Sequence, residues 1–342
     1  MTPQKPTLRD VASAAGVHPA TVSRALNPET RALVKAPTAR RVIRIAEELG
    51  YRPNPIARQL KTAKSGTIGL VIPDLTNPFF PPIVRGVEDI LAPAGYSCLI
   101  VNTDNDLARE RAQIDSLRFR QVEGLIIATA YLDHPLLREL QRDGVAMVLV
   151  NRRSDGVDVP SVTPDDVDGI ELAVEHLAGL GHRRIAHLAG PGSTSTGAVR
   201  ARAFRSAVRN RGLDDDPGLV VACARWSEDA GADALRQLLD AGPSFTAVVA
   251  GNDLIALGCY DVFAERGISC PHDISVVGIN NMPFLDKLGP SLTSVAVPHQ
   301  QIGQEAARML LESIREPGRA ARAVTLSVSL RARGSTSQPR RG

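Results

Sequence analysis

The sequence lacks several features that would assign it to other classes of protein. Aromatic residues make up only 4% of its 342 residues, and it contains no apolar run of the about 18 residues that a membrane span requires. The first ten residues are polar and do not form a secretory signal, which predicts a cytoplasmic protein with no membrane partner. The four cysteines are widely spaced and form no CxxC pair. This pattern is typical of small buried apolar residues rather than of a metal or disulfide site.

The net charge is only +3, but it is unevenly distributed along the chain. Residues 1–65 contain twelve Lys and Arg against four Asp and Glu, a net charge of +8, so the remaining residues together carry −5. Such a partition indicates that residues 1–65 form a small module that binds a polyanion, and that the rest of the chain does not bind one. At roughly 100–200 residues per domain, the length also predicts two or three domains.

The basic N-terminal region has the pattern of a helix-turn-helix supported by a third helix. Thr7–Asp10 has the form of a capping box at the start of a first helix, which Gly16 ends. Pro19 suits the first turn of a second helix, 19–26, whose outer face carries small and polar side chains. Such a helix can approach the major groove closely, and Arg24 can donate to guanine or to a phosphate. A basic three-helix bundle that binds protein is the alternative interpretation.

Three stretches of this region carry a specific resemblance, namely TLRDVA (7–12), GVHPATVSRALN (16–27) and ELGYRPN (48–54). They are similar to the LacI/GalR family of bacterial transcription regulators. The resemblance implies a homodimer that binds a pseudo-palindromic operator in double-stranded DNA. It implies DNA contacts at the following residues: Thr7, His18, Pro19, Ala20, Thr21, Ser23, Arg24, Asn27, Tyr51, Asn54, Ala57, Arg58 and Leu60.

The sequence departs from the family at two helix starts. His18 and Lys35 stand where a capping serine is usual, which predicts weaker caps that cost about 1 kcal/mol each. Both side chains are alternatively candidates for phosphate contacts.

The segment 53–65 contains two helix-breaking prolines followed by a stretch long enough for only two helical turns. A helix this short is marginal in water, so a flexible linker is one interpretation. In the family, this segment resembles a hinge helix that folds on operator DNA, paired with its dimer mate. The resemblance places Leu60 as an apolar wedge in the minor groove, with Ala57 in close contact beside it and Arg58 near the backbone.

From Thr67 onward, apolar runs alternate with helical patterns. This alternation predicts an α/β fold with two doubly wound parallel sheets, each covered by helices on both faces. Ligands bind such sheets beyond the carboxyl ends of the strands. The expected strands are 67–72, 97–101, 124–128, 146–150, 185–189, 219–222, 247–250 and 274–278.

Further motifs in this region resemble the periplasmic-binding-protein-like effector domain of the family, among them DLTNPFF (74–80), HLAGLGHRRI (176–185) and NDLIALG (252–258). In that domain the chain crosses between two subdomains three times, here expected near 162, 290 and 323. The expected organisation is therefore a helix-turn-helix domain (1–52), a hinge (53–65), an effector-binding and dimerisation domain (66–333), and a disordered tail (334–342). The N-subdomain would comprise 66–162 and 291–322, and the C-subdomain 163–290 and 323–333. The tail is short, polar and without heptads, which favours a dimer over a tetramer.

Polar and aromatic residues follow many of the expected strands. In the family, the matching aromatic rings stack on a sugar, and Arg and Asn bond its hydroxyls; each residue could instead serve the core or surface. Asn151 and Asn280 stand where sugar-binding members often have Asp, so with two arginines the site favours an acceptor-rich or anionic ligand, such as a sugar acid, a sugar phosphate or a small carboxylate. The candidate effector-binding residues are Asp74, Asn77, Phe79, Phe80, Asn151, Arg152, Thr196, Arg200, Trp226, Asn252 and Asn280.

We therefore expect a ligand-controlled transcription regulator, a repressor in particular, with no cofactor, no metal and no catalytic activity. The glycine-rich stretch 190–197 is neither a GxGxxG motif nor a Walker A loop, and no GxSxG or metal-spaced His/Cys set is present. One alternative is a sugar-binding or transport receptor, which would leave residues 1–62 without a role. Another is an enzyme with a doubly wound fold.

Overall fold

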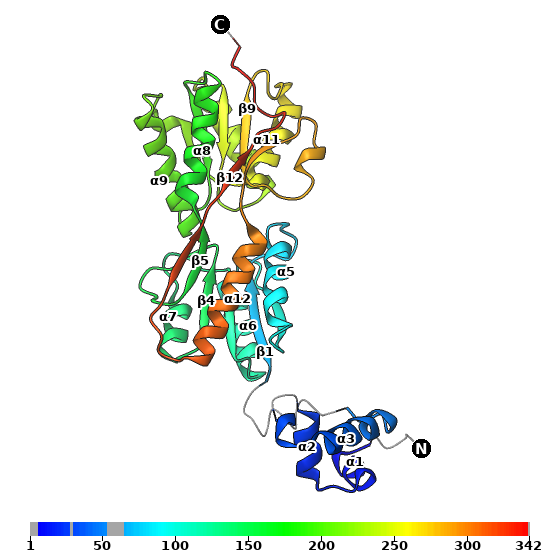
Figure 1. Ribbon diagram of the computed structural model, residues 1–342. Helices are drawn as coiled ribbons and strands as arrows, with labels where there is room; N and C mark the ends of the chain where they lie inside the picture. Colours follow the sequence, from blue (N-terminus) through cyan, green and yellow to red (C-terminus); the bar gives the residue numbers. More distant parts are fainter. Residues whose placement is uncertain (1–5, 28–29, 53–64, 341–342) are drawn as a thin grey trace. The chain divides into compact units, whose positions relative to one another are not determined.

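The computed structural model describes residues 6–27, 30–52 and 65–340, and the chain divides into two compact units, 1–65 and 66–342 (Figure 1). None of the helices within the described ranges is long and apolar enough to cross a membrane. The four cysteines are free thiols, and two of them, Cys223 and Cys259, are buried.

The first unit is built from short helices around a small apolar core of alanine and valine side chains. Its elements are α1 (Leu8–Ala15), α2 (Pro19–Leu26), the 3-10 turn η1 (Arg31–Leu33) and α3 (Ala36–Glu48). The predicted capping box is confirmed: Asp10 Oδ2 accepts from the Thr7 backbone N at 2.7 Å, and Thr7 Oγ1 accepts from the Asp10 backbone N. Gly16 ends α1 in the left-handed conformation, with φ of 61°. The helix-turn-helix therefore follows from caps and turns that the sequence displays.

His18 provides a side-chain cap although it stands where a serine is usual. His18 Nδ1 accepts a hydrogen bond from the backbone N of Ala20 at 3.2 Å, so an imidazole performs the role of the usual hydroxyl at the start of α2. Lys35, at the start of α3, makes no such side-chain bond. Only the second departure from the family therefore leaves a helix start without a side-chain cap.

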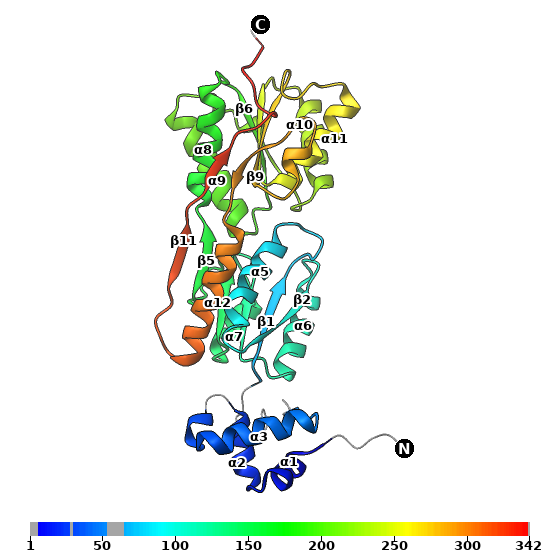
Figure 2. The ribbon, with the colours of Figure 1, turned by 45° about the vertical axis from the view of Figure 1, so that its right-hand side comes forward.

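The second unit contains two six-stranded sheets. In the first sheet every strand pair is parallel, and the strand order is β11-β5-β4-β3-β1-β2. Helices α5 and α12 pack on one face of this sheet and α6 and α7 on the other (Figure 2). The strands are β1 (Thr67–Ile72), β2 (Ser97–Asn102), β3 (Gly124–Ile127), β4 (Met147–Val150), β5 (Ser161–Pro164) and β11 (Ala323–Leu326); the helices are α5 (Phe80–Leu91), α6 (Leu107–Phe119), α7 (Pro135–Arg142) and α12 (His299–Arg315).

The second sheet has the order β12-β10-β9-β8-β6-β7 and is parallel except for the pair β10–β12. Helices α8 and α9 cover one face, and α10 and α11 cover the other. The strands are β6 (Ile185–Ala189), β7 (Val220–Ala222), β8 (Ala247–Ala250), β9 (Ser275–Asn280), β10 (Thr293–Ala296) and β12 (Ser329–Arg331); the helices are α8 (Asp166–Gly179), α9 (Ser195–Asn210), α10 (Glu228–Ala241) and α11 (Asp253–Arg266), and the 3-10 turns η2 (Pro217–Leu219) and η3 (Leu285–Lys287) also belong to this region. The predicted fold class of two doubly wound parallel sheets is confirmed.

The chain crosses between the two sheets three times, as expected, but each crossing comes later than predicted. Since β5 and β11 belong to the first sheet and β10 to the second, the crossings fall after 164, after 296 and after 326 rather than near 162, 290 and 323. The predicted subdomain bounds (66–162 with 291–322, and 163–290 with 323–333) are shifted accordingly. The strands absent from the prediction, β5, β10, β11 and β12, are only three or four residues long, and their apolar pattern is too short to be distinguished from a loop.

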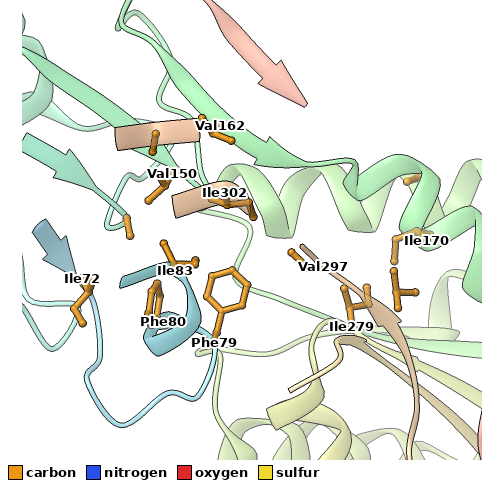
Figure 3. Close-up of a cluster of buried hydrophobic side chains, with 14 of the residues drawn as sticks. Ile72, Phe79, Phe80, Ile83, Val150, Val162, Ile170, Ile279, Val297 and Ile302 are labelled. Atoms are coloured by element: carbon orange, nitrogen blue, oxygen red, sulfur yellow. The ribbon is translucent and has the colours of Figure 1, made fainter. Parts of the chain in front are cut away.

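One apolar cluster continues from the first sheet into the second. Figure 3 shows Phe79, Phe80 and Ile302 of the first subdomain near Val297 and Ile279 on the side of the second. The crossings therefore run beside a shared core rather than through an isolated linker.

The prediction of a disordered tail over 334–342 is wrong for residues 334–340. Ser335 is fully buried. Its hydroxyl accepts from the backbone N of Thr293 at 2.8 Å and donates to the carbonyl of Val276 at 2.6 Å. The polar tail residues thus satisfy backbone groups at the starts of β10 and β9, a role that a polar sequence does not reveal.

Two histidines hold the next tail residues. His176 Nε2 lies 2.9 Å from Thr336 Oγ1, and His182 Nε2 lies 2.9 Å from the carbonyl of Ser337. Burial lowers the pKa of both imidazoles. Both therefore serve in packing and hydrogen bonding.

We predict that Ser335→Ala lowers the free energy of unfolding by about 1–3 kcal/mol, because it leaves a buried backbone N–H without its acceptor. Urea unfolding followed by circular dichroism measures this change. Ser206→Ala, on the exposed side of α9, is the matched control and should stay within about 0.5 kcal/mol of the wild type. Equal effects of the two substitutions would contradict a structural role for the tail.

Candidate DNA-binding surface and ligand cavity

The predicted DNA-contacting residues gather around α2 of the first unit. Thr7, His18, Ala20 and Arg24 are exposed. Pro19, Thr21, Ser23 and Asn27 are half-buried, and the buried positions of α2 are Val22 and Ala25. The helix therefore directs its apolar side to the core and presents a small polar face with one guanidinium.

The other predicted DNA contacts divide into two groups. Tyr51 is half-buried and packs against the core of the first unit, and burial raises the pKa of its hydroxyl. Asn54, Ala57, Arg58 and Leu60, with the whole predicted hinge helix, lie outside the described residues.

In the second unit, all eleven candidate effector-binding residues line one cavity of about 240 Å³. They come from the ends of strands of both sheets and from the loops and helix starts that follow them. Because these strands are parallel within each sheet, the following segments gather at one edge, and the two edges enclose the cavity. The lining also contains Pro73, Asn105, Arg225 and Ser227, which sequence reasoning missed. Asn105 follows the end of β2, so the rule that identified the other residues could have found it.

Arg200 is buried in the cavity wall, and each of its three guanidinium nitrogens already has a partner in the protein. Its Nε and Nη2 lie 2.7 and 2.6 Å from Asp166 Oδ1, and its Nη1 donates to the Gly251 carbonyl at 2.6 Å. The guanidinium carbon is 5.7 Å from the centre of the Trp226 ring, within cation–π range. Burial raises the pKa of Asp166, while Arg200 acts in the opposite direction. Arg200 is therefore a neutralised part of the wall.

Arg152 is equally buried, with 5% of its surface exposed, but its situation differs. Its Nε and Nη1 have no hydrogen-bond partner within the described part of the chain. Burial lowers the pKa of the guanidinium to about 10, which leaves it charged at neutral pH. The neighbouring Asn151 Oδ1 and the Trp226 Nε1 are also without partners there. A buried donor without a partner is costly, so these atoms indicate where a polar ligand would bind.

The aromatic part of the wall depends on a glycine. A Cβ at Gly190 would lie 2.0 Å from Cη2 of Trp226, so the ring rests directly on the backbone that follows β6. On the other side of the cavity, Phe79 and Phe80 meet edge to face, with ring centres 5.0 Å apart. Both are nevertheless part of the apolar core, so they combine a core role with a place in the lining.

A buried carboxylate positions the last part of the wall. Asp253 accepts from Ser294 Oγ at 2.6 Å and from the Met282 backbone N at 2.9 Å. It thereby holds the loop after Asn280, which has a φ of 121° in the region that favours glycine. Asn252 also has a structural role, because its Oδ1 accepts from the Ile255 backbone N at the start of α11.

Two family models match the chain. The model of bacterial regulatory proteins of the lacI family matches residues 7–54, and the model of periplasmic binding proteins and the sugar-binding domain of the LacI family matches residues 65–333. The chain belongs to the LacI family. The predicted family is therefore confirmed, together with the function of a DNA-binding transcription regulator whose second domain takes a small-molecule effector. The match over 7–54 also argues against a transport receptor.

Among LacI-family relatives, the HTH-type transcriptional repressor CytR of Escherichia coli is 34% identical to this chain over 96% of each sequence. A ribose operon repressor of Halalkalibacterium halodurans is 33% identical over 90% of each. Both are repressors by name.

Solved structures of the LacI family have the same architecture. A lac repressor dimer bound to operator and the anti-inducer ONPF has a TM-score of 0.85 and 28% identity, covering 98% of this chain and all of that one. The regulator CelR in complex with cellobiose has a TM-score of 0.74 and 32% identity, covering 96% and 99%. A LacI-family regulator of Enterococcus faecalis with bound ribose has a TM-score of 0.71 and 30% identity, covering 80% and 99%.

We predict that this LacI-family regulator loses stability between about pH 4 and pH 7 through Asp253. Burial raises the pKa of its carboxyl from 3.8 to about 7, so the folded chain binds the proton more tightly than the unfolded chain. The resulting stabilisation is complete below pH 3.8 and is lost as the pH rises through about 7.

Urea unfolding of the wild type and Asp253→Asn at several pH values measures this contribution. The stability of the wild type relative to the variant should fall over this window, whatever slope the other titrating groups give to both proteins. Asp158→Asn, in an exposed loop, is the control and should keep the wild-type slope. Parallel slopes for all three proteins would rule out Asp253 as the cause.

Proposed function

We propose that this regulator is a homodimeric repressor that reads its operator with α2 and releases or binds it in response to a small polar ligand. The exposed face of α2 carries the proposal, because it joins small side chains with Arg24 on a unit of net charge +8. Ala20, Thr21 and Ser23 allow close approach to the major groove, and Arg24 can donate two parallel hydrogen bonds to a guanine. Each protomer would occupy one half-site of a pseudo-palindrome.

The edge strand β2 supports self-association. Leu99 and Ile100 are adjacent and thus point to opposite faces of the strand, yet 37% and 40% of their surfaces are exposed. An apolar edge strand that is open on both faces is an unprotected pairing site unless another chain covers it. A second copy of this chain satisfies that requirement with the symmetry that a two-fold operator demands.

The effector is a small ring compound rich in hydrogen-bond acceptors, a sugar or a sugar-derived acid or phosphate. A cavity of about 240 Å³ accommodates a molecule of this size, and the aromatic walls suit a ring face. The unpartnered atoms supply three donors, on Arg152 and Trp226, against one acceptor, on Asn151. We infer a binding site without catalysis, because no cluster of three His, Cys, Asp or Glu side chains within the described ranges could hold a metal and the cavity carries no nucleophile paired with a base.

We predict that Arg24→Gln weakens binding to a selected operator by about 1–3 kcal/mol and relaxes base preference at one position of each half-site. The operator is first obtained by selection from a random double-stranded library. Fluorescence anisotropy at several salt concentrations then measures affinity, and the logarithm of the association constant should fall linearly with the logarithm of salt.

Arg202→Gln, an exposed arginine of α9 in the second unit, is the matched control and should retain wild-type affinity. Binding that shows no salt dependence, or an equal loss in both variants, would exclude the proposed interface.

We predict that Arg152→Met weakens effector binding at least about tenfold, which corresponds to about 1.4 kcal/mol, while operator binding without effector is retained. A thermal-shift screen of sugars, sugar acids and sugar phosphates identifies a binder, and calorimetry compares the variants. Arg153→Met is a close control, because the neighbouring side chain does not line the cavity and instead donates to Thr163 and Thr325. If both substitutions weaken binding equally, the cavity is not the effector site.

A further inference from the structure

The loop that follows β9 presents Asn280 to the cavity in an unusual backbone conformation. Asn280 is the last residue of β9 and lines the cavity. Asn280 and the next residue, Asn281, have φ values of 121° and 56°. A positive φ is unfavourable for a residue with a Cβ, and such residues persist where the surrounding structure holds them. The hydrogen bonds around this loop therefore bear on the shape of the cavity wall.

The backbone of the loop is held from within the second subdomain. The backbone N of Asn281 donates to Ser294 Oγ at 3.0 Å, and the same hydroxyl donates to Asp253 at 2.6 Å. The backbone N of Met282 donates to the other carboxylate oxygen of Asp253 at 2.9 Å. The side chain of Asn281 takes no part in these bonds, so it is free to receive a second support from elsewhere.

That support comes from Arg333. This residue lies two positions beyond β12, on the segment that enters the second subdomain at the third crossing. Its Nη2 donates to Asn281 Oδ1 at 2.6 Å, and its Nη1 donates to the carbonyl of Leu292 at 2.7 Å. Its backbone N donates to Thr293 Oγ1 at 2.8 Å. Because a guanidinium is planar and its donors point in fixed directions, the two side-chain bonds set the loop in place relative to the start of β10.

We propose that Arg333 is a positioning residue of the effector site, which keeps Asn280 in its cavity-lining conformation by holding the side chain of Asn281. The proposal rests on the effector site proposed above. Arg333 does not line the cavity, so it acts on a bound sugar through the loop. Asp253 holds the loop from inside the fold, and Arg333 holds it from the segment after the third crossing. The affinity for a sugar therefore depends on a residue outside the cavity.

Hydrogen exchange of the full-length protein without effector tests the hold on the loop. Mass spectrometry compares peptides that cover 281–284 and 247–250. We expect Arg333→Met to speed exchange of the loop peptide at least about tenfold and to leave that of the central strand β8 unchanged, because only the loop loses its bonds. Arg331→Met removes the same charge from an exposed arginine of β12 and should leave both peptides unchanged. A uniform rise in both peptides, or no rise in the loop, would overturn the proposal.

Sugar affinity tests whether the loop acts through Asn280. The probes are D-ribose, D-ribose 5-phosphate, D-glucose and D-glucuronate, titrated calorimetrically into the wild type, Asn280→Gly, Arg333→Met and the double variant. Glycine removes the side chain and suits the positive φ. We expect each single substitution to weaken binding at least about tenfold, and the double variant to bind as Asn280→Gly does, because Arg333 positions a side chain that is then absent. Additive losses would show a general loosening of the cavity and would count against the proposal.

Arg333→Lys covers the case in which Arg333→Met folds poorly. Lysine keeps the charge but lacks the planar fork that bonds to two acceptors at once. We expect exchange and affinity between those of the wild type and of Arg333→Met, and wild-type values in both measurements would contradict the role of the fork. Wild-type sugar binding by Asn280→Gly would refute the effector site itself. Weakened binding by Asn280→Gly together with wild-type binding by Arg333→Met would refute only the role of Arg333.

Discussion

The second unit depends on the burial of one ion pair, between Arg200 and Asp166. Asp166 begins α8 directly after the first crossing, and Arg200 lies in α9. Through its third contact, to the Gly251 carbonyl, the same guanidinium reaches the end of β8, and its flat face lies near Trp226. One side chain therefore fixes the crossing, a helix, a strand end and the aromatic wall relative to one another. Since each nitrogen of Arg200 already has a partner, whereas Arg152 Nε and Nη1 have none within the described residues, Arg152 is the better placed of the two to donate to a ligand.

The strand pattern could be predicted because buried parallel strands are continuous apolar runs bounded by loops. β1, β4 and β8 are examples, and each is fully buried or nearly so. β5 and β11 could not be predicted, because four-residue strands interrupted by polar residues or proline lack such a run. In addition, β11 pairs with β5, about 160 residues earlier in the chain. The prediction of a disordered tail was wrong for a related reason. Ser335 is polar, and only the folded sheet brings its hydroxyl to the backbone groups with which it forms hydrogen bonds.

The candidate site was easier to locate than to interpret. The rule that segments after parallel strands meet at one edge, together with the resemblance to the family's effector domain, brought eleven residues together from sequence alone. It could not distinguish Arg152 from Arg200, because the difference lies in Asp166, a residue beyond the first crossing.

The arrangement of the wall constrains how a ligand could act. Arg152 and Asn151 lie on the side of the first sheet, whereas Trp226 and Asn280 lie on the side of the second. A ligand that bonds to residues of both subdomains therefore binds with different affinity to each relative position of the two. Only such a difference in affinity can shift a conformational equilibrium. The apolar cluster shared by both sheets resists separation, because opening it would expose side chains such as Phe79 and Val297. A relative motion of the subdomains that keeps this core closed therefore costs less free energy than one that opens it. The loop after Asn280, held by Asp253, would move with the second sheet as a rigid extension.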